Sequence, residues 1–132
     1  IDVSQSALDI AKERFPDSNV RFEKQDIFDM PEKYHGYFDF VFEALTIQSL
    51  PVEFREKMIK AVADTVAEEG HLLLVAHKRE AQFDGPPWPL EPNEVDLFKV
   101  HGMRELFHEL HTEASKISSI RFRVLYTKEK TL

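Results

Sequence analysis

Three acidic residues stand where predicted strands end, which is where ligands bind in open α/β sheets. Asp2 ends an opening strand fragment, Asp26 follows a short strand, and Glu43 follows the apolar run FDFVF. A carboxylate at the first point can accept both hydroxyls of a ribose, and one at the second can accept from the exocyclic amine of adenine. An acid at the third can face a sulfonium or amino group, or a second substrate. This order predicts a nucleotide-containing ligand at one edge of a sheet.

Each acid also has a simpler structural explanation, and the sequence leaves both readings open. Asp2 precedes a predicted helix, whose dipole favours an acid there. Asp26 can bind its own backbone in a turn, and Glu43 can pair with a nearby Arg or Lys.

The elements that must position these acids alternate between strand and helix in the first part of the chain. They are a strand end over residues 1–3, a helix capped by Ser4 or Ser6 and closed by Pro16, a strand over 20–24, a buried strand over 38–42, a helix from Pro51, and a buried strand over 72–76 that follows a turn ending at Gly70. The first helix places Leu8, Ala11 and Phe15 on one face, and the second carries an apolar stripe of Phe54, Met58, Val62 and Val66.

The second part of the chain begins with a break. Residues 84–92 contain four prolines, so they are predicted to form a rigid loop. A short helix over 94–100 follows, and then a pair of strands over 103–111 and 120–127, the latter with Ile120, Phe122, Val124 and Tyr126 on one face. The pattern predicts a single α/β domain over residues 1–132, with a mostly parallel sheet, helices on both sides and an antiparallel edge.

The composition of the chain limits the classes of molecule that it is expected to bind. The chain has 17 basic and 24 acidic residues and a net charge of −7, with no basic stripe, which disfavours nucleic acid and anionic membranes and favours a small-molecule acceptor. No apolar run is long enough to cross a bilayer, and no secretory signal is visible. The chain has no cysteine, which fits the cytoplasm and excludes thiolate metal ligands and a cysteine nucleophile.

Other polar residues are given structural explanations first. His108 and His111 superficially resemble a zinc motif, but their spacing is i, i+3 rather than i, i+4, so no metal site is predicted. His77 follows a buried strand and is a candidate base, although an ordinary strand-end role is favoured. Arg55, with Lys57 and Lys60, is predicted to lie on the solvated face of a helix.

Several segments together resemble the class I S-adenosyl-methionine-dependent methyltransferases. IDVSQSALDIA is similar to their second strand with its capped helix, QDIFDMP to the segment after the third strand, and FDFVFEALTIQSLP with EEGHLLLVA to the fourth and fifth strands. GPPWPLEPNEVDLF is similar to the thiopurine S-methyltransferase-like branch. The resemblance extends from Ile1 to about Lys128.

This resemblance implies a Rossmann-like fold, S-adenosyl-methionine as cofactor and a role for each candidate residue. Asp2 would bind the ribose and Val3 would pack on adenine, with Asp26 and Ile27 at the adenine edge. Residues 43–46, including Glu43, would line the methionine end of the cofactor. Thr46, Gln48 and Trp88 would border the acceptor, with a structural anchor as the equal alternative for Trp88. No catalytic residue is assigned; Glu43 and His77 are the candidates if the acceptor is oxygen or nitrogen.

Two departures from the family pattern affect these expectations. Glu43-Ala44 stands where the thiopurine branch usually carries Asp-Arg, which argues against a sulfur acceptor. The chain also lacks the glycine-rich loop and the first strand of the sheet, which we expect upstream of Ile1. An upstream segment, a partner chain such as a second copy, or rearranged pairing would fill the central position, and the fragment alone is expected to be inactive.

Two other functions remain open at this point. A nicotinamide-dependent oxidoreductase would use an acid like Asp2 in the same way, although Asp26 and the proline-rich segment argue against it. A non-catalytic, truncated domain that acts through a partner chain would explain the absence of the glycine-rich loop.

Overall fold

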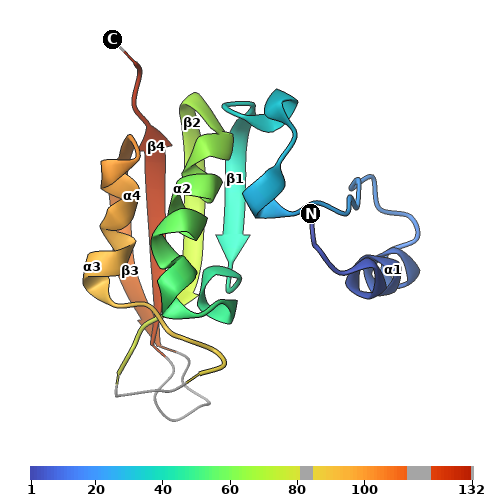
Figure 1. Ribbon diagram of the computed structural model, residues 1–132, viewed down its shortest axis with the longest axis horizontal. Helices are drawn as coiled ribbons and strands as arrows, with labels where there is room; N and C mark the ends of the chain where they lie inside the picture. The colour runs from blue at the N-terminus through green and yellow to red at the C-terminus, as the bar shows by residue number, and fades with distance from the viewer. Residues whose placement is uncertain (81–84, 113–119, 132) are drawn as a thin grey trace.

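The computed structural model describes residues 1–80, 85–112 and 120–131. Its centre is a four-stranded sheet with the order β1-β2-β4-β3. The strands are β1 (Phe38–Ala44), β2 (Val66–His77), β3 (Met103–Thr112) and β4 (Ile120–Lys128). β1 runs parallel to β2, whereas β4 is antiparallel to both β2 and β3 (Figure 1). The α/β architecture with an antiparallel edge is therefore confirmed.

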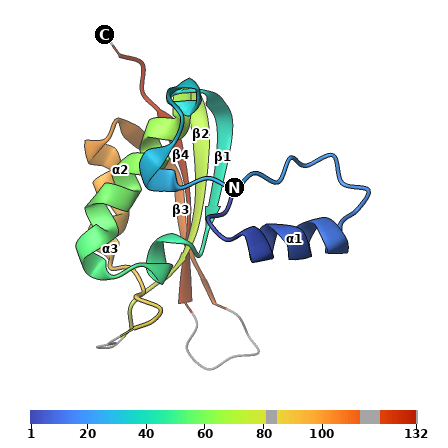
Figure 2. The ribbon, with the colours of Figure 1, turned by 45° about the vertical axis from the view of Figure 1, so that its right-hand side comes forward.

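The helices are distributed unevenly about this sheet. They are α1 (Gln5–Arg14), α2 (Arg55–Thr65), α3 (Pro92–Val95) and α4 (Leu97–Val100), with 3-10 turns at Ile27–Asp29, Glu32–Tyr34, Ile47–Ser49 and Val52–Phe54. Figures 1 and 2 show α2, α3 and α4 against one face of the sheet, while α1 stands apart beyond β1. Helices on both faces were expected, but in the described ranges they cover only one. None of the described helices has the length and apolar character that a membrane span requires.

The core lies between α2–α4 and the covered face of the sheet. Alternation places Leu72, Leu74 and Ala76 of β2 on that face, each 0% exposed. Phe122, Val124 and Tyr126 of β4 lie on the same face, as their spacing predicts. The buried residues contributed by the helices are Met58, Ile59, Val62, Ala63, Val95 and Phe98. Burial of each large apolar side chain contributes roughly 1.5–3 kcal/mol, which fixes these helices on the sheet.

The opposite face of the sheet carries an exposed apolar row. Phe42 pairs with Leu73, Leu73 with Leu125, and Leu125 with Phe107, so all four strands contribute. Phe42 and Phe107 are 60% and 48% exposed. The prediction of a buried strand over 38–42 is wrong, because β1 is the edge strand of the described sheet and Phe40 and Phe42 lie on the face that no described helix covers.

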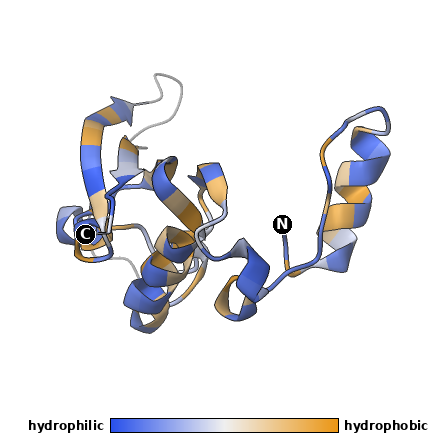
Figure 3. Ribbon diagram, turned by 90° about the horizontal axis from the view of Figure 1, so that it is seen from above, coloured by the Kyte–Doolittle hydropathy of each residue, from blue (hydrophilic) through white to orange (hydrophobic). Residues whose placement is uncertain are grey.

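Local signals predicted some boundaries correctly and others not. Ser4 caps α1 by accepting from the Ala7 N–H, as predicted. The predicted strand over 20–24 is reduced to one parallel bridge between Asp2 and Lys24. Gly70 lies inside β2 rather than in a turn before it, because β2 already begins at Val66. Figure 3 shows that hydrophobic residues are interspersed with polar ones on α1, which packs little of its surface against the sheet.

Candidate functional site

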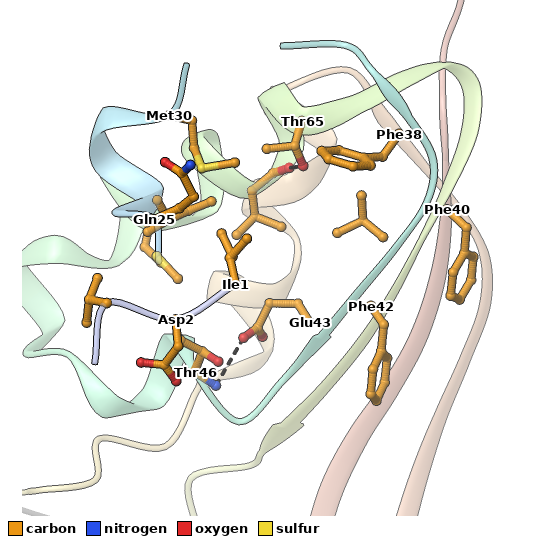
Figure 4. A pocket seen from close by; sticks show the side chains of 15 residues that line it. Ile1, Asp2, Gln25, Met30, Phe38, Phe40, Phe42, Glu43, Thr46 and Thr65 are labelled. Atoms are coloured by element: carbon orange, nitrogen blue, oxygen red, sulfur yellow. Dashed lines mark hydrogen bonds between the residues drawn. The ribbon is translucent and has the colours of Figure 1, made fainter. Parts of the chain in front are cut away.

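A cavity of about 400 Å³ lies between β1 and the segment that contains the Asp2–Lys24 bridge. Its lining includes five of the residues predicted for the site: Asp2, Val3, Ile27, Glu43 and Thr46. Figure 4 shows the side chains of Asp2, Glu43 and Thr46 close together at one end of this cavity. The structure therefore brings together residues from three separate predicted strand ends.

Asp2 is held in place by its backbone and by the start of α1. Its N–H donates to the Glu23 carbonyl at 3.3 Å, and its own carbonyl accepts from the Gln25 N–H at 3.1 Å. The carboxylate oxygen Oδ1 accepts from the Ser4 N–H at 2.8 Å. This acid thus lies next to a helix N-terminus, where its charge is stabilised.

Glu43 is the most unusual polar group in the cavity. Its side chain is buried, at 6% exposure, although it is ionisable. Oε1 accepts from the Thr46 N–H at 3.0 Å (dashed in Figure 4), but Oε2 is buried without a hydrogen-bond partner among the described residues. Burial raises the pKa of the Glu43 carboxyl, against the opposing effect of the Thr46 hydrogen bond. A buried acceptor without a partner is costly, so the geometry suits a ligand that donates a hydrogen bond at this point.

Asp26 is positioned differently from Asp2 and Glu43. Its side chain accepts from the Phe28 N–H at 2.9 Å and caps the turn Ile27–Asp29. Asp26 is exposed, and the neighbouring residues Gln25 and Ile27 line the cavity instead. The structure therefore gives this acid the turn role that the sequence left open.

Gln48, His77 and Trp88 form a second group beside the site rather than inside the cavity. The Gln48 side chain is buried, and its Oε1 accepts from the His77 N–H at 2.7 Å. The Gln48 carbonyl accepts from the Trp88 N–H at 2.6 Å. None of the three lines the cavity. The backbone hydrogen bond between Trp88 and Gln48 nevertheless connects the proline-rich loop, residues 85–90, to the loop after β1.

Sequence reasoning missed several residues of this region. Gln25, Met30, Met58, Val62 and Thr65 also line the cavity. Arg55 was predicted to be solvated, but it is 4% exposed. The available signal was its position three and four residues before the buried Met58 and Ile59, which places it on the apolar face of α2. Across the described ranges, no group of three His, Cys, Asp or Glu side chains is arranged to hold a metal ion.

Comparison with known proteins identifies a matching family. The model of the thiopurine S-methyltransferase family matches residues 3–129. No curated protein matches the chain.

The solved structures that share this fold include several methyltransferases. An S-adenosyl-methionine-dependent methyltransferase from Methanosarcina mazei superposes with a TM-score of 0.74 at 12% identity, covering 97% of this chain and 80% of that one. The N-methyltransferase NodS from Bradyrhizobium japonicum, in complex with S-adenosyl-homocysteine, gives 0.78 at 14% identity, covering 98% and 65%. The 1,6-didemethyltoxoflavin-N1-methyltransferase from Burkholderia thailandensis gives 0.70 at 10% identity, covering 97% and 59%. The chain thus spans only part of each of these proteins.

Proposed function

Because the chain belongs to the thiopurine S-methyltransferase family of S-adenosyl-methionine-dependent methyltransferases, we propose that the protein transfers a methyl group to a small-molecule acceptor. The observation that supports this is the cavity along β1, where Glu43 and Thr46, at the carboxyl end of the strand, lie in one lining with Asp2, Val3 and Ile27. Ligands of open α/β folds bind at such strand ends.

The cofactor would lie along this cavity, and its chemistry fits the residues present. Asp2 would accept from the ribose hydroxyls, with Val3 and Ile27 against the adenine. Asp26 would reach the adenine edge only through the carboxylate that also caps its own turn, so its assignment depends on the family resemblance. Glu43 would accept from the amino group of the methionine moiety, which is the kind of donor that its unpaired Oε2 requires.

The bound cofactor supplies an activated methyl group with a good leaving group, so the protein mainly has to hold the acceptor in line and exclude water. An amine or hydroxyl acceptor also needs a proton acceptor. Glu43 is the better candidate, because it lines the cavity and burial raises the pKa of its carboxyl above the usual value. In that role Glu43 would face the acceptor instead of the methionine amino group. His77 remains the second candidate; the hydrogen bond that it donates to Gln48 comes from its backbone N–H.

The Glu43 carboxylate also affects which atom of the acceptor can be methylated. A thiol reacts as its anion, and an ionised Glu43 in a cavity with a mainly apolar lining would repel that anion. A nitrogen or oxygen acceptor on the side of Thr46, Gln48 and Trp88 is therefore the form of the reaction that we propose.

Titration with S-adenosyl-homocysteine tests the cofactor assignment. It is done by calorimetry on this chain and on the longest natural form of the protein that contains it. Asp2→Asn keeps the oxygen that accepts from Ser4, and Asp26→Asn keeps the turn cap, so neither should disturb the local backbone. Each should weaken binding by about 1–3 kcal/mol, the usual cost of losing a charged hydrogen bond.

Asp17→Asn is the matched control, because Asp17 is an exposed acid outside the cavity. Full affinity in both the Asp2 and Asp26 variants would refute their roles. If neither form of the protein bound S-adenosyl-homocysteine, the methyltransferase proposal itself would be wrong.

A second candidate function, a domain that acts by pairing with another copy of itself, is favoured by one observation. The apolar row of Phe42, Leu73, Leu125 and Phe107 lies on the sheet face that no described helix covers. Light scattering on the purified protein would give a dimer mass under this reading, and Phe42→Asp would convert it to a monomer. A monomeric wild-type protein would exclude this candidate.

A further inference from the structure

A buried arginine at the start of α2 joins the loop after β1 to the proline-rich loop and to α3. The Arg55 side chain is 3% exposed, and each of its nitrogens donates to a different partner. Nε donates to Glu94 Oε2 at 2.8 Å, in α3. Nη1 donates to the Ile47 carbonyl at 3.3 Å, in the loop after β1, and Nη2 to the Trp88 carbonyl at 2.8 Å, in the proline-rich loop.

The backbone of Trp88 is consequently fixed on both sides. Its N–H donates to the Gln48 carbonyl at 2.6 Å, while its carbonyl accepts from Arg55. Gln48 is in turn fixed to the end of β2, because its side chain accepts from the His77 N–H. The proline-rich loop, the loop after β1 and the end of β2 therefore form one hydrogen-bonded unit.

The indole of Trp88 packs against the backbone of its own loop at Gly85. Gly85 has a φ of +54°, and a Cβ built there would lie 2.2 Å from a ring carbon of Trp88. Only glycine permits this approach, since any side chain would displace the ring. The indole itself is half-buried.

The loop held by Arg55 also reaches the cavity. Thr46 lines the cavity and donates its N–H to Glu43, and the next residue is Ile47, whose carbonyl accepts from Arg55. A buried guanidinium is costly to desolvate, and an apolar side chain at the same place would cost less. A guanidinium does offer planar donors that a lysine cannot replace, and here they are directed at three separate segments.

From this geometry we propose that Arg55 is a positioning residue. It holds the proline-rich loop and Trp88 against the loop after β1, and so fixes the acceptor side of the cavity. The inference rests on the proposed function, because that function makes this side the acceptor side. The hydrogen-bonded unit itself can be tested without any cofactor or acceptor.

Trp88 is the only tryptophan of the chain, so its fluorescence reports on this loop alone. In Arg55→Lys, the charge next to Glu94 is kept but the planar set of donors to Ile47 and Trp88 is lost. We expect a red shift of the Trp88 emission and a loss of protection from acrylamide quenching, toward the value for N-acetyl-tryptophanamide. Gly85→Ala, in which the new methyl group displaces the indole, provides the reference signal for a released loop.

Two control variants on α2 separate positioning from general loss of stability. Ile59→Val removes one methylene from a residue that is 0% exposed. It therefore lowers the free energy of unfolding without touching the hydrogen bonds of Arg55. Lys60→Met removes a charge whose ion pair, with Asp64, is at the surface. Neither should change the Trp88 signal below the unfolding transition, which circular dichroism locates for every variant.

The outcomes are distinct. A changed Trp88 signal in Arg55→Lys, with wild-type signals in both controls, supports the proposal. An unchanged signal in Arg55→Lys, or an equal change in Ile59→Val, overturns it. Titration of the same variants with S-adenosyl-homocysteine is a separate test. Absence of binding in the wild-type protein counts against the proposed function. Selective loss of affinity in Arg55→Lys would place Arg55 in the cofactor site and overturn the positioning role.

Discussion

Replacing Glu43 by Gln is predicted to stabilise the free protein and to weaken its cofactor complex. The carboxylate is 6% exposed, and its Oε2 has no partner among the described residues. The carboxamide of Gln keeps an oxygen for the Thr46 N–H and removes the buried charge. The amide nitrogen that replaces Oε2 also has no partner, but it is neutral and costs less to bury than a charge, so the free energy of unfolding at neutral pH should rise by about 1–3 kcal/mol.

The stability difference between the wild-type protein and Glu43→Gln should depend on pH, in a direction that follows from the pKa shift of Glu43. Burial raises the pKa of Glu43 in the folded protein above its value in the unfolded chain. Between these two pKa values the folded protein binds more protons, so the free energy of unfolding falls as the pH rises through this window. Below the window the carboxyl is protonated in both states, and the advantage of Glu43→Gln should disappear. Above it the advantage should be constant.

Urea denaturation followed by circular dichroism, at a series of pH values from acid to neutral, measures this difference. Glu53→Gln is the matched control, because Glu53 is exposed and lies just before α2. Added S-adenosyl-homocysteine should stabilise the wild-type protein more than Glu43→Gln; at a hundred times the dissociation constant the wild-type gain is about 2.7 kcal/mol. Equal or lower stability of Glu43→Gln at neutral pH, or a difference that does not vary with pH, would refute the reasoning.

Three further substitutions have defined outcomes. Trp88→Ala should change acceptor turnover or selectivity more than S-adenosyl-homocysteine affinity; if only the melting temperature changes, Trp88 is a structural anchor. Tyr126→Phe should lower the free energy of unfolding by about 1–3 kcal/mol in urea denaturation, because the buried Val95 carbonyl loses the hydroxyl that donates to it at 2.8 Å; no loss would mean that water replaces this bond. Ser4→Ala should destabilise α1 by about 1 kcal/mol, because the helix loses its N-cap. Amide hydrogen exchange should become faster in α1 but not in α2, and an equal change in both helices would contradict a local effect.

The sequence by itself determined the features that depend on neighbouring residues. Ser4 caps α1 because the capping bond spans only three residues, to the Ala7 N–H. Phe122, Val124 and Tyr126 are buried together because successive side chains of a strand alternate between its faces. The motifs that resemble methyltransferases are likewise local, and the family match confirms them.

The tertiary structure decided the features that depend on distant segments. FDFVF is the same apolar run whether helices cover one or both faces of its sheet, and the placement of α2–α4 on one face, with β1 at the edge, left Phe42 exposed. Arg55 reaches Glu94 across 39 positions and Trp88 across 33, so periodicity could place it on a buried face but could not name its partners. Burial and hydrogen bonding of a polar side chain are set by whatever packs against it, and that is fixed only when the chain folds.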